Sequence, residues 1–194
     1  MSKANQSKKE KFTQPEKKRK TPLIGAMVVL GIAIVVGGIY FGSKSSDNDQ
    51  YAVANIGEKV NYSSDPLFQA EKEPVQGEEG KVVVATLSEI KDKKFIYTEY
   101  QNGEKVVPLT AYTLPSGKVV VAVSLCEPCN SVSFRIVNDK IVCNACGTTW
   151  ELESLKGVSG ACQTYPPERL VYTQNGDKLE LEQAVLDNWE PRAL

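Results

Sequence analysis

The pattern of hydrophobic and polar positions divides the 194 residues into segments of different character. Residues 1–21 are polar and rich in lysine, so they bury too little apolar surface to offset the entropy lost on ordering. We therefore expect a disordered basic arm. Residues 23–41 contain no charged side chain, and a helix rising about 1.5 Å per residue would carry them across a hydrocarbon core of about 30 Å. A single transmembrane helix is predicted over residues 22–42.

The flanks of this apolar segment predict its orientation. Four basic residues, at 17–20, directly precede it, and the positive-inside rule places such a flank in the cytoplasm. A cleaved signal peptide is the alternative, but the segment is longer than a usual signal core and its exit has no A-x-A-like cleavage site. We expect a single-pass protein of the cell membrane, with a cytoplasmic N-terminus and an extracytoplasmic C-terminal domain.

The remainder of the chain predicts a linker and then a mostly β domain. Residues 43–80 show no sustained period, which is typical of a flexible linker. From Lys81 onward, short runs rich in Val, Ile, Tyr and Thr alternate with turn residues, as in antiparallel strands. Strands are predicted near residues 81–86, 94–100, 104–113, 118–124, 132–137, 140–143, 148–152, 169–174 and 178–182. A helical turn or two is expected only near 182–189, so a small antiparallel β domain should occupy residues 81–190.

Charge and composition narrow the chemistry. The formal net charge is −1, yet residues 1–20 hold eight basic side chains against two acidic ones, so the predicted β domain is acidic. Nucleic acid is an unsuitable partner for such a domain. The sequence has no histidine, which removes the commonest general base and the commonest nitrogen ligand for metals. We predict no catalytic residues, and this composition favours a non-enzymatic electron carrier or metal-binding protein over an enzyme.

The cysteines carry the strongest chemical signal. Two C-x2-C pairs, Cys126 with Cys129 and Cys143 with Cys146, are separated by thirteen residues that predict a strand, a turn and a strand. Two such knuckles can bring four thiolates to one metal centre. Two disulfides or buried free thiols are the alternatives. In an extracytoplasmic domain disulfides can form, although a bridge within one C-x2-C pair would close a very short loop and stabilise little. The fifth cysteine, Cys162, is a candidate additional ligand or redox thiol.

These motifs carry a resemblance to known families. The stretch from Cys146 to Trp150, followed by Gly157, Gly160 and a Pro-Pro pair, resembles the second half of a Rieske domain. The order CEPC, CNACGTTW and SGACQTYPP resembles the membrane-anchored FtrD-like family of iron-sulfur proteins over roughly residues 81–182. A Rieske centre uses two histidines, which this chain lacks, so a cluster here would be all-thiolate and of lower potential.

The resemblance implies a function and partners. It implies a four-cysteine iron-sulfur cluster of the 2Fe-2S type that transfers electrons in association with iron transport, next to an iron permease or another redox membrane protein. It also implies that the loop bearing Cys162 covers the cluster. The alternative is a structural zinc site of zinc-ribbon type, in which the domain acts as an interaction module or permease subunit.

Overall fold

The computed structural model describes residues 49–194, a mostly β domain, and residues 1–48 lie outside the described part. The predictions for the basic arm and for the transmembrane helix fall on those outer residues. Among the residues described, no helix combines the length and the apolar character needed to cross a membrane.

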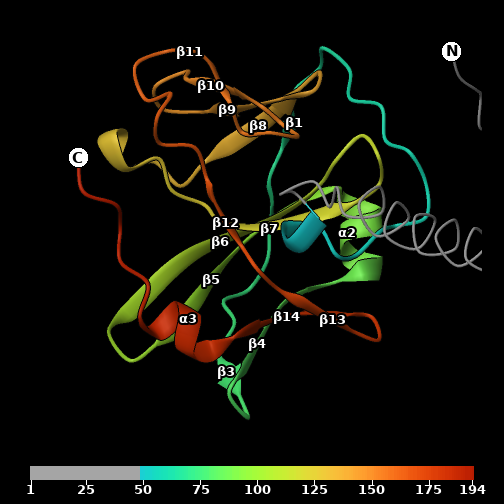
Figure 1. Cartoon of the computed structure of the whole chain (residues 1–194), viewed down its shortest axis with the longest axis vertical. Coiled ribbons are helices and arrows are strands. Elements are labelled where there is room, and N and C mark those ends of the chain that lie inside the picture. Colours follow the sequence, from blue (N-terminus) through green and yellow to red (C-terminus); the bar gives the residue numbers. More distant parts are fainter. Residues whose placement is uncertain (1–48) are drawn as a thin grey trace, which may run out of the picture. The chain divides into compact units, whose positions relative to one another are not determined.

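The strands of the described domain form three sheets (Figure 1). The outer sheet has the order β13-β14-β4-β3 and consists of β13 (Thr173–Asn175), β14 (Lys178–Glu182), β4 (Lys81–Thr86) and β3 (Gly77–Glu78). The middle sheet has the order β12-β7-β6-β5-β2 and consists of β12 (Glu168–Leu170), β7 (Val119–Val123), β6 (Lys105–Thr113), β5 (Phe95–Asn102) and β2 (Ala70–Glu71). The cysteine sheet has the order β1-β8-β9-β10-β11 and consists of β1 (Leu67–Phe68), β8 (Phe134–Val137), β9 (Lys140–Cys143), β10 (Thr149–Glu151) and β11 (Gly157–Ser159).

Short helical segments connect the strands of the described domain. They are η1 (Asp49–Tyr51), α2 (Leu87–Lys93), η2 (Glu127–Cys129) and α3 (Gln183–Asp187). Helix α2 begins with a capping box, in which the Thr86 side chain accepts from the Glu89 N–H and the Glu89 carboxylate accepts from the Thr86 N–H. It ends where Lys94 adopts a left-handed conformation, which turns the chain into β5.

The middle sheet is covered on both faces, as the burial of strand β7 shows. Its sequence is a continuous apolar run, VVVAV, and all five residues are buried. Val119, Val121 and Val123 belong to one core cluster, which also contains residues of the outer sheet. Val120 and Ala122 belong to a second cluster, shared with the cysteine sheet. An unbroken apolar run is the pattern expected of a strand that is covered on both sides.

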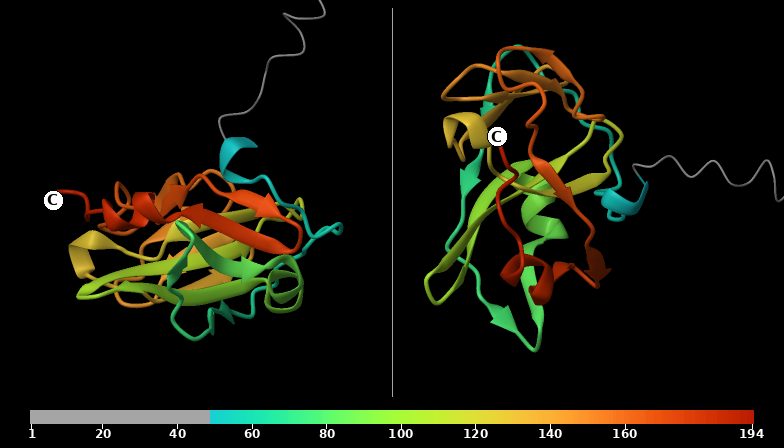
Figure 2. Two further views of the ribbon diagram at one scale, coloured as in Figure 1. Left: turned by 90° about the horizontal axis from the view of Figure 1, so that it is seen from below. Right: turned by 60° about the vertical axis from the view of Figure 1, so that its left-hand side comes forward.

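Strands β8 to β11 of the cysteine sheet lie in the chain between β7 and β12, which belong to the middle sheet. Strand β7 pairs directly with β12, and Val123 lies opposite Glu168, so the chain leaves and returns at neighbouring positions. The segment between them contains all five cysteines. The right-hand view of Figure 2 shows the orange strands of this segment above the green strands of the middle sheet. The pairing of β7 with β12 therefore fixes the two ends of this segment next to each other.

Most predicted strands are confirmed, and the differences have local causes. Strands β4 and β14 match the predicted residues 81–86 and 178–182. The predicted strand 169–174 is two strands, β12 and β13, because the chain passes there from the middle sheet to the outer sheet. Helix α2 was not predicted. The helical turn expected near 182–189 is α3.

The predicted linker over 43–80 needs correction in its described part. Ala52, Ala54 and Ile56 are buried, and three short strands in this region pair with the sheets. The Ala54 N–H donates to the Tyr172 hydroxyl at 2.9 Å, and the Ile56 N–H donates to the Gly117 carbonyl at 2.9 Å. These apolar residues are few and widely spaced, so they form no periodic pattern, yet each fits against a distant part of the domain.

Candidate metal centre

The first knuckle is a tight reversal that begins directly after β7. The Cys126 N–H donates to the Ser131 carbonyl at 2.8 Å, which closes the loop around η2. Pro128 occupies an early position of η2, where a missing N–H costs nothing, and Asn130 ends the turn with φ of 51°. Within this turn, the Cys129 N–H donates to the Cys126 carbonyl at 3.3 Å. The local sequence thus brings the two cysteines to one side of the backbone.

The second knuckle begins at the last residue of β9. The Cys143 N–H donates to the Thr148 carbonyl at 2.9 Å, and the Gly147 N–H donates to the Cys143 carbonyl at 3.0 Å. Gly147 has φ of 70°, a conformation that other residues adopt only with strain. Strand β10 follows and pairs with β9, so the knuckle is the end of a hairpin.

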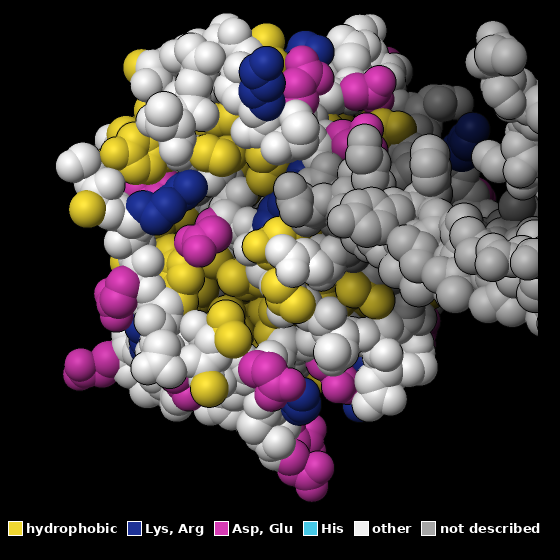
Figure 3. All heavy atoms as spheres, viewed as in Figure 1, with side chains coloured by type: hydrophobic (Ala, Val, Ile, Leu, Met, Phe, Trp, Pro, Cys, Tyr) yellow, Lys and Arg dark blue, Asp and Glu magenta, His cyan; other side chains and the backbone are white. Residues whose placement is uncertain are grey.

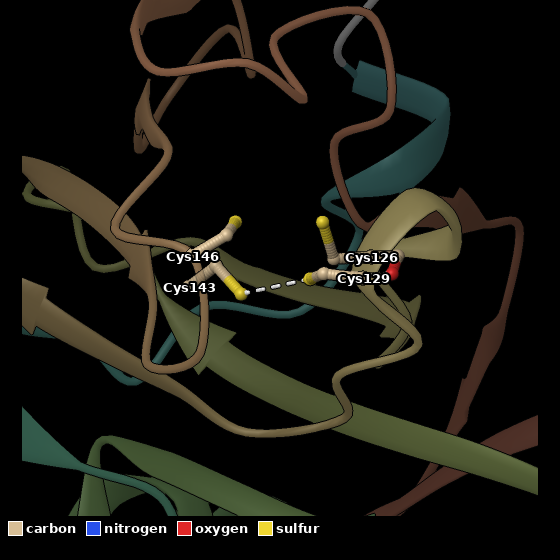
Figure 4. Close-up of side chains that lie close together, drawn as sticks. All are labelled: Cys126, Cys129, Cys143 and Cys146. Carbon is tan, nitrogen blue, oxygen red and sulfur yellow. Dashed lines mark hydrogen bonds between the residues drawn. The ribbon is translucent and has the colours of Figure 1, made fainter.

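The β8–β9 hairpin brings the two knuckles together. Phe134 lies opposite Cys143 in this hairpin, so the second knuckle returns to the place where the first one ended. The sulfur atoms of Cys126, Cys129, Cys143 and Cys146 all lie within 4.8 Å of one another, and those of Cys129 and Cys143 are 3.6 Å apart (Figure 4). The structure therefore groups the four cysteines that the sequence singled out, in an arrangement that could hold a metal ion.

The cysteines differ in exposure. Cys126 and Cys143 are buried, Cys129 is half-buried and Cys146 is exposed. Burial raises the pKa of the Cys126 thiol well above its usual range, and the neighbouring sulfurs raise it further. Burial likewise raises the pKa of Cys129 to about 11. Without a metal, these two thiols therefore hold their protons in neutral solution.

Cys146 behaves in the opposite way. Burial acts to raise its pKa, but hydrogen bonds from the Thr148 hydroxyl and N–H to the thiolate outweigh this effect and lower the pKa to about 6. The Thr148 hydroxyl lies 3.2 Å from the Cys146 sulfur. Cys146 is thus the thiolate that is already formed at neutral pH, at the exposed side of the group.

This difference gives the first prediction, which concerns the metal-free protein kept reduced. Iodoacetamide reacts with thiolates, so alkylation of Cys146 should rise through pH of about 6, whereas Cys129 should react only near pH 11. Mass spectrometry of peptides alkylated across a pH series measures both. Thr148→Val, which removes the donating hydroxyl, should move the Cys146 profile to higher pH. Identical pH profiles for Cys146 and Cys129 would contradict the difference in burial and hydrogen bonding described for the two thiols.

Cys162 lies beside the four-cysteine group but outside it. It is buried, and its thiol interacts with that of Cys126. Its N–H donates to the Thr148 hydroxyl oxygen at 3.2 Å. The same Thr148 hydroxyl therefore contacts both Cys146 and the loop that carries Cys162.

The loop that carries Cys162, residues 160–167 between β11 and β12, is held in place by close packing. Trp150 is fully buried, and its indole N–H donates to the Gln163 carbonyl at 2.9 Å. Gly160 approaches Thr148 so closely that a Cβ at this position would lie 2.4 Å from the threonine hydroxyl oxygen. The loop thus depends on Trp150 and on the absence of a side chain at residue 160.

Sequence reasoning missed three residues of the site: Thr148, Glu127 and Arg192. Thr148 stands beside a second threonine, and nothing local shows which of the two faces the sulfur. Glu127 lies within the first knuckle and pairs with Arg192, which is 65 positions away. A position within a C-x2-C pair was the only available signal for Glu127, and Arg192 had none.

Comparisons with known proteins agree with the chemistry of this centre. No curated protein and no solved structure matched the chain. A family model, described as membrane iron-sulfur containing protein FtrD-like, matches residues 90–192. This range includes all five cysteines and the strands that position them. Since it covers more than half of the sequence, the chain belongs to the FtrD-like family of membrane iron-sulfur proteins.

Proposed function

We propose that this chain is a membrane-anchored, extracytoplasmic electron carrier whose all-thiolate iron-sulfur centre serves iron transport. The graded exposure of the four cysteines carries the proposal. Cys126 and Cys143 lie in the core, where they are protected from water, while Cys146 reaches the surface. An electron carrier needs a protected centre with one side close to a partner, and this arrangement provides both.

The residues present suit thiolate ligation. Cys126, Cys129, Cys143 and Cys146 would hold the centre, and the sequence has no histidine that could replace any of them. A centre of the 2Fe-2S type would supply one-electron transfer at a lower potential than a histidine-ligated one. The Thr148 hydroxyl stabilises negative charge on the Cys146 sulfur, and hydrogen bonds to ligating sulfurs raise the potential of such centres.

A structural zinc site is the second candidate, and the compactness of the group favours it. Four thiolates at about 2.3 Å from one tetrahedral ion lie about 3.8 Å apart. The four sulfurs here are all within 4.8 Å of one another, which suits a single ion with little movement. A two-iron cluster would divide the four thiolates between two irons, so it would require some of these sulfurs to lie farther apart.

The proposed partners are the membrane and an iron permease or another redox membrane protein. Residues 22–42 would anchor the chain, with the β domain outside the cytoplasm. On the face in Figure 3, basic side chains are scattered among acidic ones, and the visible described residues form no continuous basic patch. Cys162 would act as an additional ligand or as a redox thiol beside the centre.

Anaerobic purification of the full chain in detergent tests the choice between the two metals. The iron-sulfur proposal predicts a coloured protein, with charge-transfer absorption in the visible that bleaches on reduction, and iron and acid-labile sulfide in equal amounts. A colourless protein with one zinc per chain would refute electron transfer and support the structural role. Zinc-supplemented and iron-supplemented cultures provide the matched comparison for metal supply during expression.

A further inference from the structure

The first knuckle contains a buried carboxylate that forms an ion pair with Arg192. The Glu127 side chain is only 4% exposed, although it stands between two cysteines of the centre. Arg192 contacts it with two hydrogen bonds: Nε donates to Oε1 at 2.5 Å and Nη2 donates to Oε2 at 2.7 Å. Two parallel bonds between a guanidinium and a carboxylate fix distance and orientation together.

The same arginine also contacts the loop that carries Cys162. Its Nη2 donates to the Pro166 carbonyl at 2.6 Å, and its guanidinium carbon lies 5.6 Å from the centre of the Tyr165 ring. The Tyr165 hydroxyl in turn donates to the Ala193 carbonyl at 3.2 Å. Figures 1 and 2 show the segment after α3 running back to the yellow turn η2. Three segments thus meet at Arg192: the first knuckle, the Cys162 loop and residues 188–194.

We infer that Arg192 is a positioning residue for the four-cysteine centre, which it stabilises by clamping the first knuckle to the Cys162 loop. The side chain neutralises the carboxylate of Glu127, a residue that stands within the first C-x2-C pair. It also keeps the loop in place over the knuckle. The inference goes beyond the proposed function and needs only that the four cysteines bind a metal, whether iron or zinc.

Arg192 and Glu127 should not contribute equally to the stability of the metal centre. Arg192→Gln leaves the Glu127 carboxylate buried and without its charged partner, which is unfavourable. Glu127→Gln leaves an arginine whose side chain is 32% exposed, so its charge can turn toward water. The double variant removes both charges, so it should recover part of what Arg192→Gln loses. A general loss of packing would instead make the double variant the worst of the three.

Zinc release from the full-length, zinc-loaded protein tests the inference. The test is valid whether the native metal is iron or zinc. The rate of transfer to a chromophoric chelator should rise about tenfold or more in Arg192→Gln, less in Arg192→Lys and least in Glu127→Gln. Lys140→Gln is the matched control. It also breaks an ion pair, between Lys140 and Glu151 of the cysteine sheet, but this pair is exposed and its Nζ and Oε1 atoms are 3.4 Å apart. Its rate should stay close to that of the parent.

Hydrogen exchange on the same zinc-loaded samples separates positioning from unfolding. Arg192→Gln should expose amides of residues 126–131 and 162–167 while β5 and β6 keep their protection. An unchanged release rate in Arg192→Gln, or exchange that rises equally across the middle sheet, would overturn the inference. Neither result bears on whether the native centre contains iron, so the proposed electron-transfer function is tested separately.

Discussion

Replacing any one of Cys126, Cys129, Cys143 or Cys146 by serine is expected to remove most of the bound metal and to loosen the cysteine sheet. The four sulfurs lie within 4.8 Å of one another, so each supplies one corner of the shell. Loss of a group that only orients a ligand typically weakens metal affinity about 10- to 100-fold, so loss of a ligand itself should exceed about 100-fold. Metal per chain by elemental analysis, together with thermal unfolding, measures both effects.

Cys162→Ser is the matched control for this series. It makes the same chemical change at a thiol that is also buried, yet outside the group of four. It should therefore keep its metal, while the reduction potential of an iron-sulfur centre shifts because a neighbouring thiol has been removed. Full metal retention in two of the four other variants would disprove the proposed ligand set.

The four-cysteine centre could be predicted from the sequence because its geometry depends mostly on residues that are close together in the chain. Each C-x2-C pair fits within one turn, and Asn138 and Asp139 mark the hairpin that joins the two knuckles. The β strands were readable for a similar reason, since turn residues separate runs of β-branched side chains. One missed element also had a local signal: Thr86 and Glu89 match the capping-box spacing that begins α2.

The rest of the site depends on contacts between distant parts of the chain. Arg192 reaches Glu127 only because α3 directs the following residues back toward the first knuckle. Buried Ala54 contacts Tyr172, 118 positions away, whose hydroxyl accepts from the Ala54 N–H and donates to the Val119 carbonyl. Neither contact repeats along the chain, so neither produces a period or a motif. A single sequence shows which residues suit a core, but not which distant residue each will meet.

Gly160→Ala is expected to destabilise the protein strongly, because two independent costs fall on one methyl group. Gly160 has φ of 100°, where an L side chain is strained. The added Cβ would also lie 2.4 Å from the Thr148 hydroxyl oxygen and 2.6 Å from its Cα, and a backbone atom cannot move aside cheaply. Positive φ costs about 1–2 kcal/mol and overpacking about 1–3 kcal/mol, so the free energy of unfolding should fall by about 2–5 kcal/mol.

Gly176→Ala isolates the backbone part of this effect. Gly176 has φ of 59°, and a Cβ there would meet nothing within 4 Å, so only strain of about 1–2 kcal/mol should remain. Denaturant unfolding of both variants gives the difference, and equal losses would show that Thr148 yields to the methyl group. The excess loss at residue 160 should come with faster metal release. Displacing Thr148 disturbs its contact with Cys146 and the hydrogen bond from the Cys162 N–H at the same time.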